Sequence, residues 1–148
     1  MKKLTLALLV TVGTMSFAHA AEQGNVDEAK ALSEAAAAHV VEVGVEQAAK
    51  DFMTADSEWI DRDLYVLMQA TDGVMIAHGG KPALAGLNLI DAKDPNGKEM
   101  GKEIVAMTAP GWVDYQWQNP VTQTIQDKAS WCIPIPADSV VVCVGAYK

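Results

Sequence analysis

Apolar residues recur every three or four positions over residues 26–53, and this spacing predicts one long α-helix. Asn25 and Glu28 stand where a capping box would mark its start. One face carries the apolar residues expected to pack on the rest of the domain: Val41, Val45, Ala48 and Phe52. An unbroken helix of this kind would be about 42 Å long. We expect it to bend at Gly44.

Further along the chain, apolar and polar residues alternate, which is typical of strands. Residues 64–70 and 74–78, joined by a tight turn, predict a β-hairpin. Residues 98–107 predict a short helix. Three further strands are predicted over residues 111–118, 128–133 and 140–147.

The short connections between successive strands imply antiparallel pairing. We therefore predict an α+β, PAS-like fold, in which the long N-terminal helix packs on a five-stranded antiparallel sheet with a short connecting helix. Residues 21–148 form one domain, with the helix over 26–54 and the sheet domain over 64–148. We expect any ligand pocket on the sheet face away from the long helix.

The first 20 residues have the pattern of a secretory signal peptide. Lys2 and Lys3 precede a short apolar stretch, and Ala18-His19-Ala20 provides an A-x-A cleavage site. The apolar stretch is well short of the roughly 20 residues that a bilayer-spanning helix needs. We therefore expect cleavage after Ala20 and a periplasmic protein that is not inserted in the membrane.

Composition and charge narrow the range of partners. Half of the 148 residues are apolar and 20% are charged, as in an ordinary globular domain. Without Lys2 and Lys3, nine basic and 19 acidic side chains remain, a net charge of −10. Arg62 is the only arginine, and its acidic neighbours favour a surface position. Because a phosphate-binding surface needs clustered basic side chains, nucleic acid is not an expected partner.

Cys132 and Cys143 are spaced to form a disulfide across a hairpin. A four-residue loop over residues 136–139 places them at a non-hydrogen-bonded pair, where Cβ atoms approach most closely. The same loop leaves Pro134 at a position that requires no N–H. Export favours a disulfide, and two buried free thiols are the alternative. Whether the bond would be structural or redox-active stays open.

Several segments occur in one order along the predicted mature chain: Leu64-Tyr65-Val66-Leu67-Met68, Asp72-Gly73-Val74-Met75-Ile76-Ala77-His78, Leu87-Asn88-Leu89, Lys93-Asp94-Pro95-Asn96-Gly97, Gly111-Trp112-Val113-Asp114-Tyr115-Gln116-Trp117-Gln118-Asn119-Pro120, Lys128 and Val144-Gly145-Ala146-Tyr147. Together they resemble the single Cache domain of type 2. The resemblance implies an extracytoplasmic PAS-like sensor domain, as in methyl-accepting chemotaxis proteins and histidine kinases. It also implies a small organic acid ligand such as pyruvate, acetate, propionate or lactate. Typical members lie between two transmembrane helices, whereas this chain has a signal peptide, so we expect a standalone, secreted domain.

A small carboxylate needs a cation or several donors and apolar walls. Lys128 is the expected cation, since it opens a predicted strand across from Tyr115 and Trp117, which share one face. The Tyr115 hydroxyl and the Trp117 indole N–H can donate to the ligand. His78, at the end of a strand, can donate to a ligand or satisfy the backbone of the following loop.

The remaining candidates are apolar or aromatic. Met68 and Met75 suit the wall of a small pocket. Trp131 stands where the resembled family commonly has tyrosine. Tyr65 is a weaker candidate, and Trp59 is expected to seal the junction between helix and sheet. For each of these residues, simple packing in the core is the alternative.

The sequence contains none of the GxSxG, HExxH, P-loop or GxGxxG patterns, so we do not expect an enzyme, a cofactor or a bound metal. The expected function is periplasmic binding of a small organic acid, which is presented to a membrane receptor, kinase or transporter. The alternative is a non-enzymatic interaction module with a vestigial pocket, which forms a homodimer through its N-terminal helix. The choice among acids depends on pocket dimensions that residue types alone do not give.

Overall fold

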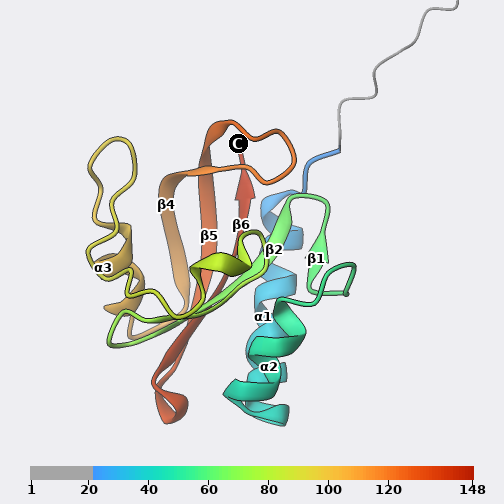
Figure 1. Cartoon of the computed structure of the whole chain (residues 1–148), viewed down its shortest axis with the longest axis vertical. Helices are drawn as coiled ribbons and strands as arrows, with labels where there is room; N and C mark the ends of the chain where they lie inside the picture. Colours follow the sequence, from blue (N-terminus) through green and yellow to red (C-terminus); the bar gives the residue numbers. More distant parts are fainter. Residues whose placement is uncertain (1–21) are drawn as a thin grey trace, which may run out of the picture.

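The computed structural model describes residues 22–148, so the predicted signal peptide lies outside the described residues. Helices α1 (Val26–Val43) and α2 (Val45–Phe52) cover one face of an antiparallel sheet, and α3 (Met100–Val105) lies on the opposite side (Figure 1). Within the described residues, no helix has both the length and the hydrophobicity needed to cross a bilayer.

The sheet has six strands, in the order β1-β2-β6-β5-β4, with β3 paired to β2. Its strands are β1 (Ile60–Asp61), β2 (Leu64–Ala70), β3 (Met75–His78), β4 (Gly111–Gln118), β5 (Ile125–Ile135) and β6 (Val140–Tyr147). Two 3-10 turns, η1 (Pro82–Leu84) and η2 (Pro136–Asp138), complete the elements. All strand pairs are antiparallel, and β2 pairs with β6, which brings the first long strand beside the last. The predicted α+β, PAS-like fold is confirmed.

Strand bounds agree closely with the hydrophobic pattern. The bounds of β2, β4 and β6 are those predicted, while β3 and α3 are slightly shorter than expected. The sheet gains a sixth strand because Ile60 and Asp61 pair with the start of β2. Strand β5 begins earlier than predicted because residues 125–127, an exposed isoleucine and two polar residues, pair with the end of β4, and it ends two residues later because residues 134–135 pair with β6. The paired strand ends face solvent and show no alternation of apolar and polar residues. The hydrophobic pattern therefore does not predict this extension.

The prediction of one continuous N-terminal helix is wrong. Gly44 has φ 84° and ψ 161°, a conformation that is not helical and that side chains with a Cβ rarely adopt. The chain turns back there, so that α2 packs against α1. His39 on α1 places Nε2 2.8 Å from Oδ2 of Asp51 on α2, which joins the two helices. The glycine thus ends one helix and begins another.

This break also corrects the predicted packing face. Val41 is 71% exposed, whereas its neighbour Val40 is buried. The buried residues of α1 are Ala29, Ser33, Ala36, Ala37 and Val40. Ala48 and Phe52 are buried as expected, but they belong to α2, which has its own orientation. Trp59 packs on Phe52 with ring centroids 5.1 Å apart and seals the junction between helix and sheet, as predicted.

The two faces of the sheet carry separate hydrophobic clusters. On the helix face, residues such as Val66, Met68 and Val144 pack against α1 and α2. On the opposite face, which we call the pocket face, Leu67 and Val113 pack with residues of α3. Because side chains alternate along a strand, neighbours such as Leu67 and Met68 belong to different clusters. Along a strand, only every second side chain therefore faces a ligand on the pocket face.

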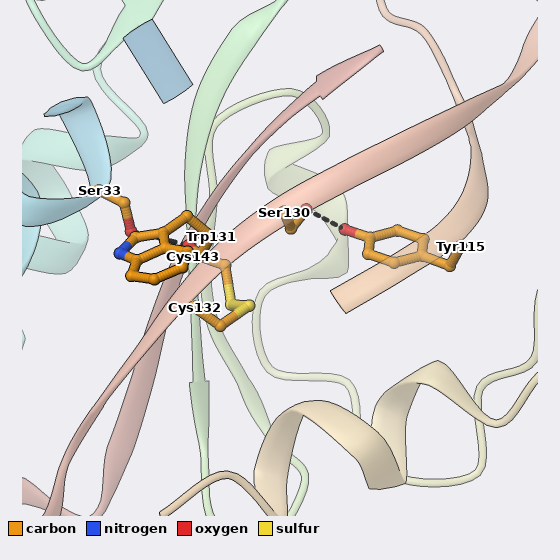
Figure 2. Close-up of a disulfide and its surroundings, with 6 residues drawn as sticks. All are labelled: Ser33, Tyr115, Ser130, Trp131, Cys132 and Cys143. Atoms are coloured by element: carbon orange, nitrogen blue, oxygen red, sulfur yellow. Dashed lines mark hydrogen bonds between the residues drawn. A yellow bond between two sulfur atoms is a disulfide. The ribbon is translucent and has the colours of Figure 1, made fainter. Parts of the chain in front are cut away.

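Cys132 of β5 and Cys143 of β6 form a disulfide on the pocket face (Figure 2). They are directly paired in the ladder, with Cα atoms 4.1 Å apart, close to the spacing of a non-hydrogen-bonded pair. The hairpin loop runs over residues 136–139, since Ile135 pairs with Val140. Both the predicted loop and the predicted disulfide are confirmed. Both sulfur-bearing residues are fully buried, which favours a structural role over a redox-active one.

Candidate ligand-binding site

A cavity of about 660 Å³ opens on the pocket face, and its size lies in the range of small-molecule sites. Tyr65, His78 and Trp117 form part of its wall, and Lys81 and Lys93 also line it. A second space of about 20 Å³, large enough for roughly one water molecule, lies between α3 and the sheet. His78 and Trp117 line both spaces, so they lie between the open cavity and the apolar interior.

Lys128 reaches this region by crossing a neighbouring strand. It belongs to β5, and strand β6 separates β5 from β2. Gly145 of β6 leaves the necessary room, because a Cβ at this position would collide with the Lys128 side chain and with the Ser130 hydroxyl. The Lys128 stem therefore lies across β6, and its Nζ is 3.9 Å from the ring centroid of Tyr65 on β2. Lys128 does not itself line the 660 Å³ cavity, but Tyr65 does.

The amine of Lys128 is buried without a hydrogen-bond partner. The residue is 1% exposed, and no acceptor within residues 22–148 reaches Nζ. The ring centroids of Tyr65 and Tyr147 lie 3.9 Å and 4.7 Å from Nζ, which gives the ammonium form partial stabilisation through cation–π contacts. Burial lowers the Lys128 pKa to about 7, although the charge of Asp63 acts in the opposite direction.

Three tyrosines near Lys128 have their hydroxyls held in hydrogen bonds to other groups. Tyr147 donates to the carbonyl of Gln118 at 2.8 Å, so its oxygen is free to accept from the Tyr65 hydroxyl at 3.1 Å. The Tyr115 hydroxyl lies 2.9 Å from Oγ of Ser130 (Figure 2). Burial raises the pKa of Tyr115 to about 12 and holds the pKa values of Tyr65 and Tyr147 well above their ordinary value. All three rings are therefore neutral phenols near pH 7.

His78 is buried against the same rings. Its ring centroid is 4.9 Å from that of Tyr65 and 6.1 Å from that of Trp117. The backbone N–H of Lys81 donates to Nδ1 at 2.9 Å, so the neutral ring carries its proton on Nε2. Burial, and then the charge of Lys128, lower the His78 pKa to about 3. His78 is thus a neutral donor in the cavity wall, and it also satisfies the following loop.

Asp63 ties the start of the chain to the rim of the cavity. One carboxylate oxygen accepts from the backbone N–H of Gly24 at 2.7 Å, and the other accepts from the Asn119 amide at 3.1 Å. The Asn119 side-chain oxygen in turn accepts from the N–H groups of Val121 and Thr122. Asp63 and Asn119 are both buried. The loop after β4, part of which lines the cavity, is therefore held to the segment that precedes α1.

The structure brings together five of the seven predicted ligand-binding residues on the pocket face: Lys128, Tyr115, Trp117, His78 and Met75. Met68 is not among them, since it is buried on the helix face. Trp131 also points to the helix side, where Lys30 lies 4.6 Å from its ring centroid, and Ser33 donates to its carbonyl (Figure 2). Both errors come from the alternation of side chains along a strand. Met68 directly follows Leu67 of the pocket face, and Trp131 is three residues from Lys128, so each points to the opposite face.

Sequence reasoning gave Tyr65 too little weight and did not include Tyr147. Both could have been found from the predicted strands. The register that pairs Cys132 with Cys143 also pairs Lys128 with Tyr147. Alternation along β2 likewise places Tyr65 on the face opposite to Met68, the face of Leu67. The hydrogen bonds of Asp63, in contrast, depend on tertiary packing and have no local signal.

In the described part of the chain, residues 22–148, no group of three or more His, Cys, Asp or Glu side chains is placed to hold a metal ion.

Comparisons with known proteins agree with this architecture. The sequence matches the family model of the Single Cache domain 2 over residues 3–148. It is also 31% identical over 106 residues to the sensor histidine kinase MctS of Rhizobium johnstonii. That match covers 69% of this chain but only 23% of the kinase, so the chain spans about a quarter of the length of that relative.

Solved structures are similar over most of the chain. A methyl-accepting chemotaxis protein from Vibrio parahaemolyticus has a TM-score of 0.72 and 20% identity, with 82% of this chain and 86% of that chain covered. A Cache chemosensory domain, described for carboxylic acid recognition, has a TM-score of 0.63 and 23% identity over 82% and 87% of the two chains. The periplasmic sensor domain of a chemotaxis protein has a TM-score of 0.61 and 25% identity, with 82% of this chain and 89% of that chain covered. This chain belongs to the Single Cache domain 2 family, a family of extracytoplasmic ligand-binding sensor domains.

Proposed function

We propose that this Cache domain binds a small organic acid on its pocket face, with Lys128 as the cation that receives the carboxylate. The observation that carries the proposal is a buried amine without a hydrogen-bond partner in the described chain. A buried polar group of this kind is costly for the fold, and a carboxylate would supply the missing acceptor. The neighbouring Tyr65 and Tyr147 rings leave the amine only partly stabilised.

The surroundings of Lys128 favour a small acid over a large one. Tyr65 stands between the amine and the open cavity, so we expect its ring to move when the carboxylate enters. On the inner side of His78 and Trp117, Met75 and Leu67 offer apolar walls around a space of only about 20 Å³. His78 can donate through Nε2–H. These features suit acids of two to four carbons, of the pyruvate, acetate, propionate or lactate class.

The comparisons support the sensor part of this proposal. A similar Cache chemosensory domain has been described for carboxylic acid recognition, and a relative is a sensor histidine kinase. We propose by analogy that this domain presents its ligand to a membrane receptor, kinase or transporter. The proposal assigns no catalytic role and no cofactor to the site.

Localisation is part of the same proposal. Residues 1–20 would be removed as a signal peptide, and the domain would act in the periplasm. The intact mass of the exported protein tests this, since cleavage after Ala20 leaves a chain that begins at Ala21. A mass that includes the first 20 residues would contradict it.

Binding itself is tested by a thermal-shift screen of the oxidised protein against acids of two to four carbons. Amino acids and purines serve as negative controls. A ligand at a hundred times its dissociation constant adds about 2.7 kcal/mol of stability, which raises the midpoint by several degrees in a domain of this size. The shift should be absent in Lys128→Met and present in Lys148→Met, whose exposed amine pairs with Asp114. No shift with any acid would contradict the proposal.

A second candidate function is self-association through α1. Its outer face carries exposed small residues at helical spacing, Ala31, Ala35 and Ala38, followed by Val41, which is 71% exposed. Such a face allows close approach of a second helix, and a dimer is compatible with ligand binding. Light scattering at high protein concentration tests this candidate. A monomer at all concentrations would exclude it.

A further inference from the structure

We infer that the site binds its carboxylate together with a proton, which Lys128 takes up from solvent as the ligand enters. This inference rests on the proposed function and specifies how that site responds to pH. It follows from the position of Lys128 among its neighbours in residues 22–148, which provide aromatic rings and neutral groups but no direct counter-ion.

Four strands contribute a titratable side chain beside Lys128. Strand β2 contributes Tyr65, β6 contributes Tyr147, and β4 contributes Tyr115, the cross-strand partner of Lys128. Strand β3 contributes His78. Within the described chain, these side chains leave Nζ without an acceptor.

Asp63 is the acidic group that acts on Lys128, and it acts at a distance. Its charge raises the Lys128 pKa, but no hydrogen bond joins the two side chains. Both Asp63 oxygens are engaged instead, one by Gly24 and the other by Asn119. Asp63 is therefore not free to turn toward the amine and pair with it.

The charge states of the free site follow from this arrangement. Burial brings the Lys128 pKa down to about 7, so the amine is largely neutral at pH 8. His78, with a pKa of about 3, is neutral at the same pH, and the tyrosines are neutral phenols. Above pH 8 only a small fraction of the amine carries the positive charge that would receive an anion. A carboxylate would stabilise the ammonium form and raise the Lys128 pKa.

The reaction balances without any further participant. A neutral amine, a proton from solvent and a carboxylate anion become an ammonium–carboxylate pair. One proton is taken up for each ligand bound when the free amine is neutral, and none is taken up when it is already protonated. As long as the acid itself stays ionised, affinity should therefore be nearly constant just below pH 6 and should fall by about tenfold for each pH unit above pH 8.

The experiment is calorimetric titration of the unmodified protein with pyruvate and, separately, with acetate. Titrations at pH 8 in phosphate and in Tris, whose ionisation enthalpies differ, give the number of protons exchanged. We expect uptake of nearly one proton at pH 8 and little uptake at pH 6. Binding at pH 8 without proton uptake overturns this inference and leaves the proposed function standing. No binding at either pH overturns both.

A direct measurement identifies the group that takes up the proton. In protein labelled with ¹³C at lysine Cε, the Lys128 resonance should titrate near pH 7 without ligand. Saturating pyruvate should move its midpoint upward by at least one pH unit. A Lys128 midpoint near the ordinary value of 10.5 in the free protein, or one that ligand does not move, overturns the assignment. Because no variant is needed, the test does not depend on how well a substituted site folds.

Discussion

The Nζ atom of Lys128 lies 3.9 Å from the centroid of the Tyr65 ring, two strands away across the sheet. This contact exists because Gly145 on the intervening strand has no side chain to block the lysine stem. A cation and an aromatic ring that are 63 residues apart in the sequence thus meet beside an open cavity. Carboxylate binding by Lys128, as proposed, depends on this geometry.

Gly145→Ala should disrupt the site more than a comparable substitution elsewhere. The new Cβ would collide with the Lys128 stem and with Oγ of Ser130, so the amine would be displaced from Tyr65. We expect a loss of about 1–3 kcal/mol in the free energy of unfolding and at least tenfold weaker carboxylate binding. Urea unfolding and calorimetric titration measure the two effects.

Gly111→Ala is the matched control, since this glycine is also in a strand but its Cβ would meet only the flexible end of Met107 at 3.2 Å. Equal effects of the two substitutions on binding would show that the path of the lysine stem is not important.

Replacement of Lys128 should stabilise the free protein, most strongly at low pH. The folded pKa of about 7 lies below the ordinary 10.5, so between these values the unfolded chain holds more protons and stability rises with pH. The destabilisation by Lys128 is fully present below pH 7 and is relieved as the pH rises toward 10.5. The difference in the free energy of unfolding between Lys128→Met and the unsubstituted protein should therefore be about 2–3 kcal/mol larger at pH 6 than at pH 9. Urea unfolding at both pH values tests this, and an equal effect at both would contradict the buried, largely neutral amine.

His78 should make the fold sensitive to acid. Its folded pKa of about 3 lies below the ordinary 6.5, so the unfolded chain holds more protons between these values and stability falls as the pH is lowered. His78→Asn keeps an acceptor for the Lys81 N–H but does not titrate. When the pH is lowered from 6.5 to 4.5, the free energy of unfolding of this variant should fall by about 2–3 kcal/mol less than that of the unsubstituted protein. Parallel stability curves over this range would show that His78 is not held neutral.

The disulfide should stabilise the fold without taking part in redox chemistry. Replacing both Cys132 and Cys143 with alanine should lower the free energy of unfolding by about 3 kcal/mol. Because both residues are fully buried, a mild reductant should leave the folded protein oxidised and should reduce it only under unfolding conditions. Thiol labelling with and without urea checks this second expectation. Rapid reduction of the native protein would favour a redox-active bond.

Local pattern and hairpin geometry were sufficient to predict much of this structure. Alternation gave the bounds of β2, β4 and β6, and the Cys132–Cys143 register followed from a hairpin turn centred midway between the two cysteines. The same register implies the Lys128–Tyr147 pair. The sheet side of the site was thus predictable, because strand pairing converts sequence separation directly into spatial position.

The rest required tertiary information. Gly44 was expected to bend a helix, but whether a glycine bends a helix or reverses it depends on what the second segment can pack against. Here Phe52 packs on Trp59, and His39 pairs with Asp51, which favours the reversed arrangement. Met68 and Trp131 were placed on the wrong face because residue type was weighed above strand parity. The buried hydrogen bonds of Asp63 join three segments and could not be read from any one of them.

The central claim is that Lys128 receives the carboxylate, and calorimetric titration at pH 6 tests it most directly. Pyruvate and acetate are titrated into the unsubstituted protein, into Lys128→Met and into the control Lys148→Met. We predict saturable binding of at least one acid, unchanged in Lys148→Met and weakened at least about thirtyfold in Lys128→Met, as expected for the loss of a charge-assisted contact worth about 2–4 kcal/mol. Full affinity in a folded Lys128→Met protein would contradict the account.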